Sequence, residues 1–134
     1  MAMRFDLPQP DPETERWWEA ANEDRLLMGH CPACGRHHFY PRPFCPRCHE
    51  ADVEWVEASG EATLYTWSVV HRNDLPPWPD RVPYVAAVVE LAEGPKMMTR
   101  LVDCEPEQLE VGMPLALTFV DHTDEQRLPV FRPR

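Results

Sequence analysis

The chain has 134 residues, enough for one compact domain or for a small domain with an appended module. Aspartate and glutamate number 23 against 13 for lysine and arginine, giving a formal charge of −10. Because such a chain repels polyphosphate, its composition argues against general nucleic-acid binding. Sixteen prolines and five glycines predict many turns and short elements rather than long helices.

The sequence predicts no membrane partner and a cytoplasmic location. It contains no apolar run of about 18 residues or more, and its first residues lack the basic and apolar blocks of a signal peptide. It has five cysteines, an odd number, and using four of them to hold a metal suits a reducing compartment better than disulfides do.

The N-terminal part is expected to form an extended lead-in over residues 1–10 and a short helix over residues 12–23. Asp11, Pro12 and Glu13 form a favourable helix start. Trp17 and Trp18 follow on an apolar stripe, and two adjacent tryptophans cannot both face one narrow core. We therefore expect one of them to pack on the body of the protein and the other to cover a partner or ligand, with simple packing by both as the alternative. Residues 26–28 are expected to form a short strand.

A metal site is predicted next. Cys31 and Cys34 form one Cys-x-x-Cys pair, Cys45 and Cys48 form a second, and ten residues separate the pairs. Each pair can wrap a tight turn, and a short hairpin between them returns the chain to one ion. Four thiolates fill a tetrahedral shell and leave no position for substrate, which predicts one structural zinc per chain.

The residues around the cysteines support this interpretation. Gly35 follows the first pair where the backbone often needs a positive φ, and His49 occupies the corresponding place after the second pair. Four histidines crowd the site, and because the cysteines already complete the shell we interpret them as surface residues: His30, His37, His38 and His49.

Strand patterns dominate the rest of the chain. Strands are expected near residues 53–55 and over residues 62–70, 84–91, 96–102, 115–120 and 128–131, with a bend at Ser59-Gly60 and a helical turn over residues 105–109. The five strands from residue 62 onward, with one long loop over residues 71–83, predict a closed five-stranded OB-fold barrel. The fold class is therefore mainly β, divided into a lead-in and helix (1–28), a rubredoxin-like zinc ribbon (29–52) and an OB-fold barrel (53–134). Cys104 is interpreted as a small core or loop residue.

The sequence from about Pro10 to Pro133 resembles acyl-CoA-associated OB-fold proteins with an N-terminal rubredoxin-like zinc ribbon, long known only as a domain of unknown function. The matching segments are ETERWWEA, CPACG, FYPRPFCP, CPRC, Trp55, Ser59-Gly60, SVVH, PYVAAVVEL, EGPKMMTRL, Gly112 and PVFRP. The chain departs from the family pattern at Asp24, where glycine is frequent, and at His49, where a small residue is usual.

This resemblance implies a non-catalytic accessory protein of an acyl-CoA enzyme, either thiolase-like (thiolases and aldolases of that type) or a hotdog-fold hydratase, with a possible homo- or hetero-oligomer. It also implies that the chain helps to form the site of a CoA thioester. Arginines such as Arg36 and Arg47 could supply charge for CoA phosphates, the alternative being a solvated surface. The candidate ligand-binding residues are Arg42, His71, Arg72 and Trp78, and the candidate partner-binding residues are Trp17 and Trp18.

Two other functions stay open at this point. A barrel that binds single-stranded nucleic acid needs a basic groove with stacked aromatics, and residues 84–91 and 96–102 offer few of them, which makes nucleic acid an unlikely partner. A rubredoxin-like electron carrier would hold iron on the same four cysteines, although ten intervening residues are few for that family. Catalysis by the chain alone is not expected, because Asp121 and His122 are strand neighbours whose side chains point to opposite faces.

Overall fold

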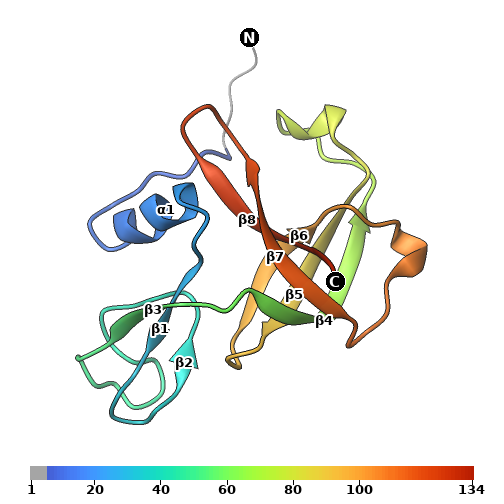
Figure 1. Cartoon of the computed structure of the whole chain (residues 1–134). Helices are drawn as coiled ribbons and strands as arrows, with labels where there is room; N and C mark the ends of the chain where they lie inside the picture. The colour runs from blue at the N-terminus through green and yellow to red at the C-terminus, as the bar shows by residue number, and fades with distance from the viewer. Residues whose placement is uncertain (1–5) are drawn as a thin grey trace.

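The computed structural model describes residues 6–134, so residues 1–5 of the expected lead-in lie outside the described part. The helix α1 (Glu15–Asn22) and a small sheet lie on one side of the molecule, and a barrel lies on the other (Figure 1). The small sheet contains β1 (Leu27–His30), β2 (His37–His38) and β3 (Glu54–Glu57). The barrel contains β4 (Glu61–Val70), β5 (Tyr84–Leu91), β6 (Lys96–Leu101), β7 (Pro114–Asp121) and β8 (Arg127–Pro133), with short 3-10 turns at Trp78–Asp80 and Pro106–Gln108.

The helix begins three residues later than predicted. The Asp11 carboxylate accepts hydrogen bonds from the backbone N–H groups of Glu13 and Thr14 and from the Thr14 hydroxyl, at 2.9–3.0 Å. These bonds lower the pKa of Asp11, the Thr14 side-chain bond most strongly. They hold residues 12–14 as a turn, so the residues expected to start the helix form its entry instead.

The ribbon sheet has the strand order β2-β1-β3, with both pairings antiparallel. The metal-binding segment is thereby a hairpin whose first strand, β1, leads from α1 into the cysteines, as expected. β3 pairs with β1 from Leu27↔Glu57 to His30↔Glu54. The segment from residue 53 onward, which the sequence analysis grouped with the barrel, therefore contributes its first strand to the ribbon.

The OB-fold prediction is confirmed by the closed strand order β4-β5-β6-β8-β7. All pairings in the barrel are antiparallel except that of β6 with β8. β5 alternates strictly, with its odd-numbered residues buried inside the barrel. A register shift between Leu64 and Thr66 bulges β4, and Gly60 has φ 92° at the predicted bend before it.

One apolar core joins the two sides of the molecule. It includes Trp17 and Ala20 from α1 and Leu27 from β1, together with barrel residues such as Leu115 and Phe131. Because the ribbon, the helix and the barrel bury side chains against one another, they form a single packed unit.

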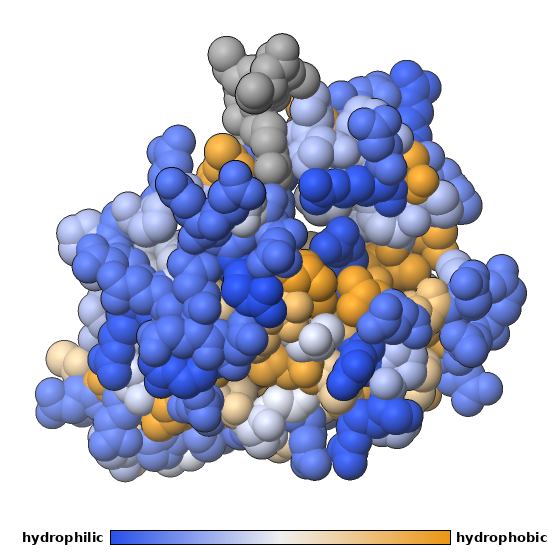
Figure 2. All heavy atoms as spheres, turned by 45° about the horizontal axis from the view of Figure 1, so that its top comes forward, coloured by the Kyte–Doolittle hydropathy of each residue, from blue (hydrophilic) through white to orange (hydrophobic). Residues whose placement is uncertain are grey.

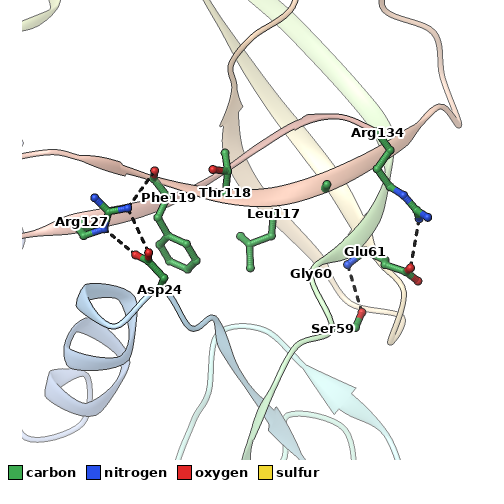
Figure 3. A pocket seen from close by; sticks show the side chains of 10 residues that line it. Asp24, Ser59, Gly60, Glu61, Leu117, Thr118, Phe119, Arg127 and Arg134 are labelled. Atoms are coloured by element: carbon green, nitrogen blue, oxygen red, sulfur yellow. Dashed lines mark hydrogen bonds and ion pairs between the residues drawn. The ribbon is translucent and has the colours of Figure 1, made fainter.

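Polar contacts also fix the end of α1 to the barrel. The Arg127 guanidinium on β8 donates to Asp24, just beyond α1, with a shortest distance of 2.7 Å (Figure 3). It also donates to Asp121 on β7 at 2.7 Å. The backbone N–H of Arg127 donates to the Asn22 side chain at 2.8 Å. Asp24 has φ 58°, a conformation that suits the glycine frequent in the family, and here its carboxylate makes this ion pair.

Candidate functional site

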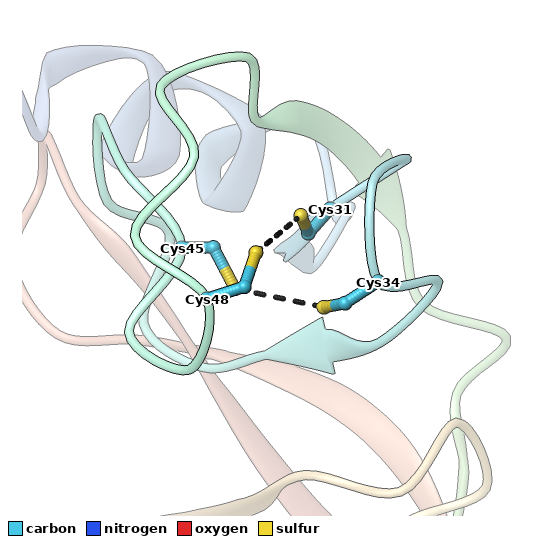
Figure 4. Close-up of side chains that lie close together, drawn as sticks. All are labelled: Cys31, Cys34, Cys45 and Cys48. Atoms are coloured by element: carbon cyan, nitrogen blue, oxygen red, sulfur yellow. Dashed lines mark hydrogen bonds between the residues drawn. The ribbon is translucent and has the colours of Figure 1, made fainter.

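The four predicted ligands come together at one point of the ribbon (Figure 4). All four sulfur atoms of Cys31, Cys34, Cys45 and Cys48 lie within 4.8 Å of one another. The Sγ atoms of Cys31 and Cys48 are 3.5 Å apart and those of Cys34 and Cys45 are 3.8 Å apart. Tetrahedral zinc with four Zn–S bonds of about 2.3 Å requires S–S separations of about 3.8 Å, so this donor set fits a zinc ion.

The two cysteine pairs adopt the same backbone geometry. In the first, the Gly35 N–H donates to the Cys31 carbonyl at 2.7 Å, and in the second the His49 N–H donates to the Cys45 carbonyl at 2.9 Å. Gly35 has φ 73°, as expected, and His49 has φ 68°, so the histidine adopts the same left-handed conformation despite its Cβ atom. Hydrogen bonds from the backbone N–H groups of Cys48 and Arg47 lower the pKa of Cys45 to about 6.

The histidines near the cysteines do not share one environment. His49 is exposed, and His30 is half-buried with its Nδ1 3.1 Å from a carboxylate oxygen of Glu54. The surface prediction is wrong for His38, which is only 7% exposed. Its ring packs across β1 onto Gly29, where the absence of a side chain leaves room for it.

A groove of about 510 Å³ lies where α1 and the ribbon meet the barrel. We call it the aromatic groove. It is lined by Thr14, Trp17, Trp18, Tyr40, Trp78, Tyr84, Ala86, Met97, Met98, Thr99, Arg100, Leu128, Pro129 and Val130. A smaller apolar hollow of about 100 Å³ shares four of these residues and extends the same surface to Trp55. Large exposed apolar side chains at this groove are typical of interaction surfaces.

The two adjacent tryptophans have different surroundings. Trp17 is 8% exposed, and its indole N–H donates to the Leu27 carbonyl at 3.0 Å. Trp18 is half-buried, meets the Trp17 ring edge-on at 4.7 Å and lines the groove. One of the two tryptophans, Trp17, therefore packs on the body of the protein, and the role of Trp18 in covering a partner or ligand stays a prediction.

Trp78 stands at the end of the groove near two arginines. Its ring centroid is 5.0 Å from that of Tyr84, 5.4 Å from the guanidinium carbon of Arg100 and 5.8 Å from that of Arg81. The loop tryptophan is therefore half-buried rather than freely exposed. Burial, and then the charge of Arg81, lower the pKa of Arg100.

The other predicted ligand-binding residues are not part of the groove. Arg42 is exposed on the ribbon, and His71 is exposed after β4. Arg72 is also exposed, and Asp74 holds its guanidinium through hydrogen bonds of 3.1 and 3.2 Å. Of the four candidates, Trp78 alone lines the aromatic groove.

A second hollow, of about 530 Å³, opens on the opposite side of β8 from the groove lining, between the end of α1, the β3–β4 connection and β7. Its apolar lining comes from Leu117 and Phe119 of β7, and Arg127 and Arg134 lie at its ends (Figure 3). Figure 2 shows apolar atoms gathered at the centre of one face, bordered by hydrophilic residues. Both arginines are engaged by carboxylates, Arg127 by Asp24 and Asp121 and Arg134 by Glu61 at 3.4 Å.

The acid and base next to each other in sequence have separate partners. Asp121 pairs with Arg127 at 2.7 Å, whereas buried His122 lies 3.1 Å from a carboxylate oxygen of Asp6. Cys104 is half-buried against the core, as interpreted from the sequence, and burial raises the pKa of its thiol. No helix among residues 6–134 is long and apolar enough to cross a membrane.

Sequence reasoning did not identify Tyr40, Met98, Arg81 or Arg100 as members of one surface. A signal existed for two of them, because Met98 and Arg100 alternate with the buried Met97 and Leu101 along β6 and must therefore face outward. Nothing in the sequence brings Tyr40 of the ribbon or Arg81 of the loop to the same place.

The domain order agrees with known families. Residues 18–54 match the family described as ChsH2, rubredoxin-like zinc ribbon domain, and residues 55–120 match ChsH2, C-terminal OB-fold domain. A solved structure titled Ltp2-ChsH2(DUF35) aldolase superposes with a TM-score of 0.84 at 38% identity, covering 95% of this chain and 98% of that one.

Two curated relatives extend this likeness. The probable enoyl-CoA hydratase alpha subunit of Thermomonospora curvata is 42% identical over 118 residues, which is 87% of this chain but 36% of that protein, so the chain spans about a third of its length. A DUF35 domain-containing scaffold protein of Methanocaldococcus jannaschii is 36% identical over 106 residues, covering 78% of this chain and 74% of the relative. The chain therefore belongs to the DUF35 family, with zinc ribbon and OB-fold domains of the ChsH2 type.

Proposed function

We propose that this chain is a non-catalytic accessory subunit of an acyl-CoA enzyme in the cytoplasm. The observation that carries the proposal is the likeness over nearly all of both chains to the structure titled Ltp2-ChsH2(DUF35) aldolase. The relative named as an enoyl-CoA hydratase alpha subunit points to the same class of chemistry. A thiolase-like aldolase or a hotdog-fold hydratase is accordingly the partner that we infer.

The arrangement of the chain supports a binding role. The metal site has four sulfur ligands and so leaves no open position at which a substrate could be activated. The aromatic groove offers Trp18, Tyr40 and Trp78, and tryptophan and tyrosine are enriched at the energetic centres of protein interfaces. In this proposal the zinc ribbon holds α1 and the groove in place against the barrel.

We further propose that the CoA thioester is bound jointly with the partner, next to Trp78. The exposed Arg42, His71 and Arg72 are the candidate contacts for the CoA phosphates at the edge of that site. A calorimetric titration with CoA tests this, with weak or absent binding expected for the chain alone and tighter binding once the partner is present. Equal affinity in both cases would contradict a shared site.

The decisive experiment for the accessory role is isolation of the tagged chain from the organism that encodes it, followed by mass spectrometry of co-purifying proteins. An acyl-CoA enzyme at stoichiometric level is the expected result. The purified chain alone should show no hydratase, thiolase or aldolase turnover, and the activity should appear with the partner. Turnover by the chain alone, or a monomer that never captures such an enzyme, would refute the proposal.

The same preparation separates this function from nucleic-acid binding. Of the outward residues of β5, Ala86, Val88 and Glu90 offer bases no aromatic surface, and Tyr84 is the one aromatic side chain on which a base could stack. Because attraction to phosphates is strongest at low salt, we expect no binding of a single-stranded oligonucleotide even there.

A further inference from the structure

One edge of β6 is open beside the aromatic groove. β6 pairs with β5 from Val85↔Leu101 to Glu90↔Lys96, but with β8 only at Leu101↔Phe131. Before Leu101, no strand among residues 6–134 pairs with this second edge. An unpaired strand edge presents backbone N–H and C=O groups to which another extended chain can add.

The backbone groups on this edge can be assigned. The Val102 N–H donates to the Phe131 carbonyl at 2.9 Å, so the main-chain groups of Val102 face β8. Because these groups alternate in direction along a strand, those of Arg100 and Met98 face the same way. The Thr99 hydroxyl closes part of the gap with a 3.1 Å bond to the Pro129 carbonyl. The stretch around Met98 is therefore the part of the edge that is free to accept a short extended segment.

The aromatic groove runs alongside this edge. Met98 is 73% exposed on one side of it, and Leu128 and Val130 of β8 line the other. A strand added to β6 would direct every second side chain toward this apolar surface, where Trp18 also lies. An extended segment that pairs with the open edge of β6 would therefore place apolar side chains in the aromatic groove.

The end of the groove carries positive charge that the chain does not neutralise. The guanidinium groups of Arg81 and Arg100 both lie within 6 Å of the Trp78 ring centroid, at 5.8 and 5.4 Å. Neither has a carboxylate within ion-pair distance among residues 6–134, although acidic residues outnumber basic ones in the chain. Arg100 is half-buried and Arg81 is exposed. Two neighbouring arginines without a counterion among the described residues favour a planar anion that accepts hydrogen bonds from both.

We propose that an extended segment of the partner enzyme adds to the open edge of β6, places an apolar side chain in the aromatic groove and pairs a carboxylate with Arg81 and Arg100. This inference rests on the proposed accessory function for the existence of a partner, and it specifies how that partner is held. A segment with alternating apolar residues before an aspartate, a glutamate or a free C-terminus has the required chemistry.

A peptide titration tests the groove without the partner. The probe is an acetylated peptide of alternating threonine and valine that ends in aspartate with a free C-terminus, and its control ends in asparagine amide. We expect the backbone amide signals of Met98 and Arg100 to shift in ¹⁵N spectra, with the control binding at least about tenfold more weakly because it lacks the charge. Arg81→Gln with Arg100→Gln should abolish the difference between the peptides. Arg132→Gln, which removes an exposed arginine outside the groove, should preserve it.

Four results would overturn the proposal. Equal binding of the two peptides would show that the carboxylate does not contribute to binding. Amide shifts confined to the hollow beside Leu117 and Phe119 would show that the segment binds there instead of in the groove. Saturable shifts of Arg81 and Arg100 with ADP, together with no peptide binding, would assign these arginines to a phosphate instead. Dimerisation that protects Met98 in the absence of peptide would assign the groove to a second copy of the chain.

Capture of the partner separates this proposal from the accessory function. The Arg81→Gln/Arg100→Gln chain should retain at least about tenfold less acyl-CoA enzyme than the wild type or Arg132→Gln. Met98→Pro, which removes an N–H from the open edge without breaking the pairing with β5, should also reduce capture. Equal capture by all variants would overturn the groove proposal and leave the accessory function intact. Failure of the wild type to capture an acyl-CoA enzyme would overturn that function, and the peptide titration would then decide the groove alone.

Discussion

The imidazole ring of His38 occupies the space directly over Gly29, its partner across the β1–β2 pair. A Cβ atom at Gly29 would overlap the Nε2, Cε1 and Cδ2 atoms of that ring. Glycine is therefore required at this position by the size of the histidine opposite, and the strand that leads into the metal site depends on the fit.

The fit can be tested with a double-mutant cycle. Gly29→Ala should destabilise the zinc-loaded protein by about 1–3 kcal/mol, the usual cost of overpacking a buried site. In the background of His38→Ala the same change should cost much less, because the ring that the new methyl group meets is gone. Urea unfolding of the four proteins measures both values. If Gly29→Ala lowers the free energy of unfolding equally in both backgrounds, the contact with His38 is not what requires glycine at residue 29.

His38 should also make the stability of the protein sensitive to acid. Neither ring nitrogen has a hydrogen-bond partner among residues 6–134, and burial, followed by the charges of Arg42 and His37, lowers the pKa of His38 below 6.5. The folded state therefore resists protonation. Stability is fully present above about pH 6.5, where the unfolded chain is also neutral, and falls as the pH drops toward the lower pKa of the folded state, by at most about 1.4 kcal/mol per pH unit.

The measurement is the free energy of unfolding in zinc-containing buffer at about pH 7.5 and about pH 5.5. His38→Phe should reduce the loss of stability between the two pH values, since phenylalanine fills a similar space and does not titrate. His71→Gln, at an exposed histidine, should retain the full loss. If His38→Phe and the wild type lose the same free energy of unfolding between the two pH values, titration of another group, such as a cysteine ligand, causes the loss.

The metal hairpin and the barrel could be predicted from the sequence because their signals are local. Paired Cys-x-x-Cys motifs fix the knuckles, and alternation of apolar residues fixes the strands, as in β5. The burial of His38 had no such signal. Four cysteines complete the metal site, so nothing in the sequence indicated a histidine inside the ribbon. A two-residue strand such as β2 is also too short for an alternation pattern to show which side chain faces inward.

His49 provides a test of the second cysteine knuckle. Its φ of 68° is costly for a residue with a Cβ atom, whereas Gly35 at the equivalent place adopts 73° without that cost. His49→Gly should therefore stabilise the zinc-loaded protein by about 0.5–1 kcal/mol, as measured by the urea midpoint. Gly35→Ala should act in the opposite direction. A destabilising His49→Gly change would mean that the histidine side chain makes a contribution larger than the backbone strain.

Loss of one sulfur ligand should abolish metal binding. We expect one zinc per chain and a colourless protein, and Cys31→Ser should lose the zinc and several kcal/mol of stability, because binding and folding of such a site are coupled. Metal analysis and thermal unfolding measure the two effects. Cys104→Ser is the matched control and should retain the zinc. A red protein with bound iron, or a Cys31→Ser chain that folds equally well without metal, would contradict a structural zinc.

The aromatic groove was only partly predictable. The sequence predicted the long loop over residues 71–83 and one outward-facing tryptophan of the pair Trp17 and Trp18, but the ligand-binding arginines that it predicted are not those near Trp78. Arg72 pairs with Asp74, two residues further along the chain, whereas Arg81 and Arg100 lie near the Trp78 ring. Such a meeting of distant segments depends on tertiary packing, which residue spacing does not encode.

The link between Arg127 and Asp24 should couple the helix to the barrel. Hydrogen bonds to Asp24, and then to Asp121, raise the pKa of Arg127, so the guanidinium stays charged. Because the pair is partly exposed, we expect a coupling energy of about 0.5–1 kcal/mol in a cycle of Asp24→Asn and Arg127→Gln. The same cycle at high salt should give a smaller value. An unchanged coupling would indicate that the hydrogen-bond geometry, rather than charge, holds the helix end.

The order of α1 and β8 along the chain has a consequence for synthesis. α1 is synthesised before β8, to which Arg127 ties it, and β8 completes the barrel between β6 and β7. During translation the apolar faces of the helix and the ribbon therefore stay uncovered until β8 has been synthesised. Zinc can bind to the ribbon before then, so the metal can keep the ribbon ordered until β8 completes the core.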